Sequence, residues 1–157
     1  MKVIAQSDLP HHDPEAGIET ERWRELAQRV LITENVTEGE LSVFFVDEKI
    51  MADLNVEHMG GEGPTDVLAF PIDGPDSVED ETTTKNNQPP RLLGDIFVCP
   101  AVARRNARTH GKTFEDEIAL LVVHGVLHIL GHDHAEDEEK QIMQQRERTL
   151  LANHHQS

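Results

Sequence analysis

Residues 113–134 read T-F-E-D-E-I-A-L-L-V-V-H-G-V-L-H-I-L-G-H-D-H, and this stretch decides the fold because it contains the most apolar helix of the chain. Thr113, with Asp116 three residues later, is typical of a helix N-terminus. Residues 118–129 are too apolar for a surface element, so we expect the helix to be buried. Gly131 is a natural C-terminal stop for it.

Four histidines lie at the end of this helix. His124 and His128 are four residues apart, so both side chains emerge on one face, a turn apart, as paired metal ligands do. If the chain reverses at Gly131, His134 can return to the same point and supply a third nitrogen. Three neutral imidazoles favour one zinc ion or a similar divalent ion and leave a position for water or substrate. The alternative is that the histidines only cap the helix or pack beside it.

Asp133 is the acid nearest to these histidines in the sequence. It could orient the second nitrogen of a ligand or accept a proton from water, which would make it part of the catalytic set with His124, His128 and His134. It could equally do no more than cap the turn.

The rest of the chain predicts four short strands and four further helices around the buried one. We expect the strands over residues 3–5, 41–46, 67–72 and 92–99 and helices over residues 21–32, from Asp47 to Gly60, from Pro100 to Gly111 and over 136–151. Pro71 favours an edge position for the third strand. The predicted fold is therefore α+β, a small mixed sheet of about four strands covered by about five helices, with the metal site at the end of the buried helix.

The length of 157 residues suits a single domain over residues 1–157. Residues 73–90 are acidic and rich in threonine and proline, which predicts a mobile loop. A lone cysteine, Cys99, fits a reducing compartment, so we expect a cytoplasmic protein. The first eight residues hold too short an apolar stretch for a signal peptide, and no apolar run is long enough to span a membrane.

Charge restricts the partners. With 14 basic and 30 acidic residues the net charge is −16, which excludes a generally basic surface for nucleic acid. Any contact with nucleic acid must therefore be local. Arg104, Arg105 and Arg108, with Lys112 soon after, could form such a basic patch. The alternative is that they pair with acids such as Glu115.

The spacing H-x-x-x-H-x-x-G-x-x-H is that of metzincin metalloproteases, which place a glutamate directly after the first histidine as general base. This chain has Gly125 there, so peptidase chemistry lacks its local base. A metallopeptidase would remain possible only if another carboxylate, such as Glu117 or Asp95, reached the metal-bound water.

The run H-G-V-L-H-I-L-G-H-D-H at 124–134 resembles the signature of the YbeY family, bacterial metal-dependent endoribonucleases of ribosomal RNA maturation. G-P-T-D-V-L-A-F-P at 63–71 resembles the family's P-T-D-V-L-S-F-P stretch, and L-G-D-I at 93–96 resembles its L-G-D-I strand. These landmarks follow the family order over residues 55–134.

The resemblance implies a zinc site at His124, His128 and His134 and a single-stranded RNA substrate. It also implies a role in maturing the 3′ end of 16S ribosomal RNA and in ribosome quality control, with the ribosome or its proteins as partners. The oligomeric state stays open. A different class of function is also open: a metal-binding ribosome-assembly factor with a mainly structural site, which a fourth protein ligand such as Asp133 would favour.

One position departs from the family pattern. Many members carry an active-site arginine where this chain has Met59. Another cation would then have to neutralise the scissile phosphate, and the nearby candidates are Arg91, Arg104, Arg105 and Arg108.

Overall fold

The structure is a computed structural model that describes residues 1–73, 91–132 and 136–156. The predicted acidic loop over 73–90, apart from its first residue, lies outside these ranges. The predicted site residues Asp133 and His134 also lie outside them.

The sheet has four strands in the order β1-β2-β4-β3. Its strands are β1 (Lys2–Ser7), β2 (Glu40–Phe45), β3 (Val67–Pro71) and β4 (Leu92–Val98). β2 is parallel to both β1 and β4, whereas β3 runs antiparallel to β4. The predicted mixed sheet is therefore confirmed, and β3 lies at an edge, as Pro71 indicated.

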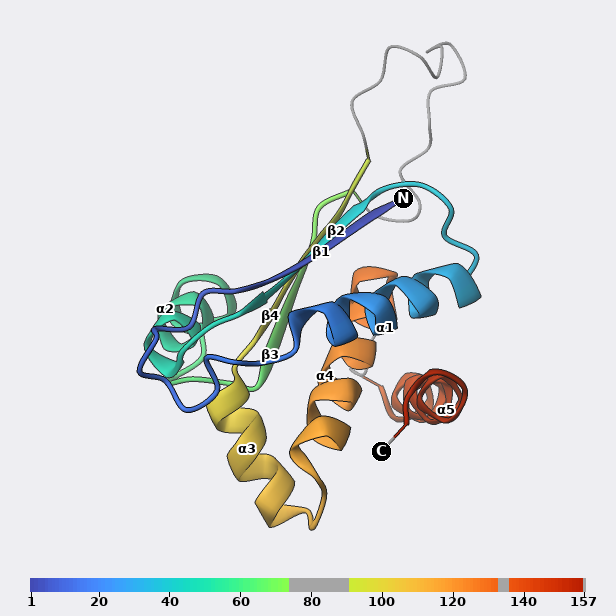
Figure 1. The fold of residues 1–157 in the computed structure, drawn as a ribbon. Coiled ribbons are helices and arrows are strands. Elements are labelled where there is room, and N and C mark those ends of the chain that lie inside the picture. Colours follow the sequence, from blue (N-terminus) through green and yellow to red (C-terminus); the bar gives the residue numbers. More distant parts are fainter. Residues whose placement is uncertain (74–90, 133–135, 157) are drawn as a thin grey trace.

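Five helices accompany the sheet in the described part of the chain: α1 (Thr20–Thr33), α2 (Glu48–Met59), α3 (Pro100–Thr109), α4 (Phe114–Ile129) and α5 (Asp137–His154). Figure 1 shows α1, α4 and α5 on one side of the sheet and α2 on the other. α4 contacts α1, α3, α5, β3 and β4 and is the central helix, so the α+β prediction is confirmed. None of the described helices is both long and apolar enough to cross a membrane.

Local sequence signals explain where two helices begin. The Asp47 carboxylate accepts a hydrogen bond of 2.9 Å from the Ile50 amide at the start of α2. The Thr113 hydroxyl accepts one of 3.1 Å from the Asp116 amide at the start of α4. Each bond satisfies an amide that has no partner within the helix, so both helix starts are defined by the chain itself.

α4 is buried because it packs directly on the sheet and on α1. The inward face of α1 consists of five buried residues, Trp23, Leu26, Ala27, Val30 and Leu31. On α4, Gly125 faces the sheet so closely that a Cβ atom there would lie 2.8 Å from Ile96 Cγ2. This close approach fixes the rotation of α4 about its axis and thereby the direction of its other faces.

The C-terminal end of α4 is also fixed by a glycine. Gly131 has a φ of 98°, and its amide donates to the His128 carbonyl at 3.1 Å. The next amide, of His132, donates back to the Leu127 carbonyl at 3.0 Å. A left-handed glycine with such bonds satisfies the last helical carbonyls, so α4 ends where the sequence predicted.

Candidate metal centre

The paired histidines lie on the last two turns of α4, and both are half-buried. The ring centroids of His124 and His128 are 6.0 Å apart, with the ring planes at 79°. Their neighbours Gly125, Val126 and Leu127 are buried. The two imidazoles therefore emerge together on one face of α4, as their spacing predicted.

A carboxylate from α5 contacts the first histidine. His124 Nδ1 and Glu147 Oε1 are 3.0 Å apart, and Glu147 is only 8% exposed. This contact is made by the Nδ1 edge of the His124 ring, which is opposite the edge that carries Nε2. The sequence analysis missed Glu147, although it carried a signal. Met143, Glu147 and Leu150 recur at helical spacing, which puts the glutamate on the inward stripe of α5.

These residues fit a zinc ion by the chemistry of their donors. Imidazole nitrogen is a preferred zinc ligand, and the second nitrogen of such a histidine commonly donates to a carboxylate. His124 and His128 are the two predicted ligands that the structure describes. No group of three potential metal-ligating side chains gathers among the described residues, and the third predicted ligand, His134, is outside them.

Neither carboxylate that a peptidase would need faces the histidine pair. Glu117 is 3.1 Å from Lys112 Nζ at the start of α4, about 10 Å along the helix from His124. Asp95 lies on β4 next to Ile96, and because side chains alternate along a strand it points away from α4. Burial raises the pKa of the Asp95 carboxyl.

The predicted basic patch is largely neutralised. Arg104 donates to both oxygens of Glu15 at 2.9 and 3.0 Å, and its guanidinium lies 4.0 Å over the Phe114 ring. Arg105 donates to Glu48 at 2.6 Å. Of the two alternatives, pairing with acids therefore holds for these two arginines, with Glu15 and Glu48 as the partners in place of Glu115. Their acidic partners are far away in the sequence and are brought close only by the fold.

Arg91 is placed differently. It lines a cavity of about 360 Å³ at the C-terminal end of α4, whose other lining residues include the apolar Ile129 and Leu130 and the acidic Glu34, Glu38 and Asp73. Met59, the position of the family arginine, is 57% exposed at the end of α2. Of the four candidate arginines, Arg91 is thus the one that shares a cavity with the end of the histidine helix.

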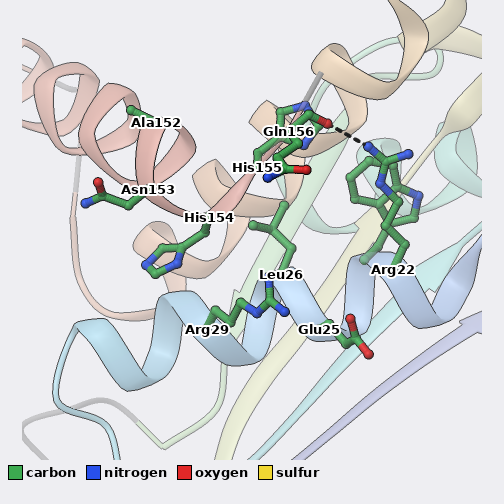
Figure 2. A pocket seen from close by; sticks show the side chains of 10 residues that line it. Arg22, Glu25, Leu26, Arg29, Ala152, Asn153, His154, His155 and Gln156 are labelled. Carbon is green, nitrogen blue, oxygen red and sulfur yellow. Dashed lines mark hydrogen bonds between the residues drawn. The ribbon is translucent and has the colours of Figure 1, made fainter.

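A cavity of about 740 Å³ between α1 and the end of α5 is not part of this centre (Figure 2). Arg22 donates to the Gln156 carbonyl across it at 3.0 Å, and His154 Nε2 is 2.8 Å from the Thr33 hydroxyl. These bonds attach the end of α5 to α1. Neither histidine of the pair lines the cavity.

Comparison with curated proteins finds close relatives. An endoribonuclease YbeY of Salinispora tropica is 46% identical over 140 residues, which cover 87% of this chain and 88% of that protein. An endoribonuclease YbeY of Frankia casuarinae is 48% identical over 120 residues, 73% of this chain and 56% of that protein. An endoribonuclease YbeY of Frankia alni is 49% identical over 120 residues, which cover 73% of this chain and 62% of that protein. The chain thus spans little more than half the length of the Frankia relatives.

The fold has a counterpart among solved structures. The solution structure of a Thermotoga maritima protein matches with a TM-score of 0.59 at 25% identity, covering 98% of this chain and 91% of that one. The family model described as endoribonuclease YbeY matches residues 9–155. The histidine run and the P-T-D-V-L-A-F-P stretch both lie inside this match, and the chain belongs to the endoribonuclease YbeY family.

Proposed function

We propose that the protein is a zinc-dependent endoribonuclease specific for single-stranded RNA. It acts in the cytoplasm on the 3′ end of 16S ribosomal RNA and in ribosome quality control. The observation that carries this proposal is the pair of imidazoles on one face of α4, one of them bonded to a buried carboxylate, in a chain of the YbeY family.

The roles proposed for His124 and His128 are argued from their positions on α4, and those proposed for His134 and Asp133 from the sequence. His124 offers Nε2 to the metal because its Nδ1 faces Glu147, and His128 provides the second nitrogen one turn later. His134 completes the set in this proposal, and Asp133 orients a ligand or accepts a proton. A zinc ion held by these residues would supply Lewis-acid catalysis for the hydrolysis of a phosphodiester bond.

The net charge of −16 requires a local cation for the substrate phosphate. Arg91 lines a cavity at the end of α4, the helix that carries the histidine pair, whereas Arg104 and Arg105 lie on α3. We therefore assign phosphate binding to Arg91, with the ribosome or its proteins supplying the remaining affinity.

Arg91→Ala is expected to weaken RNA binding about tenfold or more, because a hydrogen bond to a charged group contributes about 1.5–3 kcal/mol. The slope of log affinity against log salt should also fall by about 0.7, the value for one contact to a single strand. Fluorescence anisotropy with a short single-stranded RNA measures both quantities. Arg104→Ala is the matched control, and an equal effect of the two substitutions would contradict the assignment.

The function is tested by metal removal. A single-stranded fragment carrying the 3′ end of 16S RNA is incubated with the zinc-loaded protein, with protein treated with a chelator, and with treated protein after zinc is restored. We expect cleavage only in the first and third samples, and no cleavage of the same segment annealed to its complement. Undiminished cleavage after chelation would refute the zinc enzyme. Zinc binding without cleavage would favour the ribosome-assembly factor instead.

A further inference from the structure

Glu147 occupies a position where a carboxylate is costly. The inward stripe of α5 consists of Met143, Glu147 and Leu150, which are 1%, 8% and 0% exposed. An unpaired charge on such a stripe is strongly unfavourable. The contact that compensates for this is the 3.0 Å approach of Glu147 Oε1 to His124 Nδ1.

Stability alone does not account for this pair. Replacing a buried charged pair by apolar side chains of similar size is often neutral or stabilising. A methionine or leucine would continue the stripe that Met143 and Leu150 already form with the core. The glutamate therefore serves something other than the packing of α5.

The chemistry of the contact indicates what that is. A carboxylate oxygen accepts a hydrogen bond from an imidazole N–H, so this contact favours the His124 tautomer that carries its hydrogen on Nδ1. Nε2 then keeps its lone pair and can bind a metal. A carboxylate in this position also fixes the ring orientation of the ligand.

We propose that Glu147 is a positioning residue that holds His124 in the metal-binding tautomer and orientation, which makes α5 part of the metal centre. This inference rests on the proposed zinc function. The proposed metal centre then includes α5 in addition to the histidine run at 124–134, and the histidine spacing alone did not point to α5.

The test compares Glu147→Met with wild type. Methionine matches the size of glutamate and the apolar stripe, so the zinc-free variant should unfold at the same or a higher urea concentration. Its zinc affinity, measured by competition with a chromogenic chelator, should fall about 10- to 100-fold. Glu147→Gln keeps an oxygen that accepts from Nδ1 and should regain part of this loss. Glu139→Gln, at an exposed position of α5, is the matched control and should bind zinc like wild type.

A second readout follows the tautomer directly. Nitrogen NMR of the zinc-free protein should place the His124 hydrogen on Nδ1 in wild type and show loss of this preference in Glu147→Met. The inference is overturned if Glu147→Met binds zinc as tightly as wild type, or if wild type carries the hydrogen on Nε2. Wild-type protein that binds no zinc would refute the proposed metal site itself, and the inference with it.

Discussion

His128→Ala is expected to lose zinc binding and RNA cleavage together. The substitution removes one of the two imidazoles on this face of α4, and the methyl group of alanine has no nitrogen that could bind zinc. Removing a residue that only orients a metal ligand typically lowers metal affinity by up to about 100-fold. Because His128 is proposed to bind the metal itself, its loss should lower zinc affinity by more than that. Zinc competition and cleavage of the 16S fragment, measured on the same preparation, check both effects.

The control for this substitution is His110→Ala. His110 follows α3 and is exposed, so its removal should change neither zinc affinity nor cleavage. Both variants should keep the wild-type circular dichroism spectrum without zinc. Cleavage by a zinc-free His128→Ala protein would contradict the metal-dependent mechanism, and equal cleavage by all three proteins would indicate a contaminating nuclease.

Features set by neighbouring residues were predicted from the sequence. The starts of α2 and α4 were correct because Asp47 and Thr113 bond to amides three residues away. The edge position of β3 followed from Pro71, which cannot donate a ladder hydrogen bond and is therefore tolerated on a strand with one unpaired side. The face shared by His124 and His128 followed from the helical repeat alone.

Features set by distant residues were missed. Arg104 is bonded to Glu15, 89 positions earlier, so its charge could not be judged from its own helix. Glu147 meets His124 only because α5 packs against α4 in the fold. A single sequence carries no direct signal for such pairs except a charged residue on an inward stripe. Glu147, a charged residue between Met143 and Leu150 on the inward face of α5, carries that signal.

Gly125 shows how one residue admits two interpretations. From the sequence it indicates only that the metzincin base is missing. In the structure it is the point where α4 approaches β4, with a Cβ position 2.8 Å from Ile96 Cγ2. A side chain here would point into the core and away from the face that carries His124. The glycine is therefore required for packing, and a glutamate at this position could not reach a metal-bound water.

Gly125→Glu should accordingly destabilise the protein without creating a peptidase. It forces a carboxylate into the contact with Ile96, and a buried unpaired charge together with overpacking should lower the free energy of unfolding by about 4 kcal/mol or more. Gly125→Ala should cost less, about 1 kcal/mol, because overpacking of about 1–3 kcal/mol is offset by a gain in helix propensity of about 1 kcal/mol. Urea unfolding of the zinc-free proteins measures both values.

The outcome discriminates between the two interpretations of this glycine. Gly17→Ala is the control, since a Cβ there meets nothing within 4 Å and stability should stay within about 0.5 kcal/mol of wild type. If Gly125→Glu folded with wild-type stability and hydrolysed a peptide when loaded with zinc, position 125 would face the metal, contrary to the packing described. If it unfolds as expected, the glycine reflects the packing of α4 against β4, and its absence of a side chain carries no information about the reaction that the histidines support.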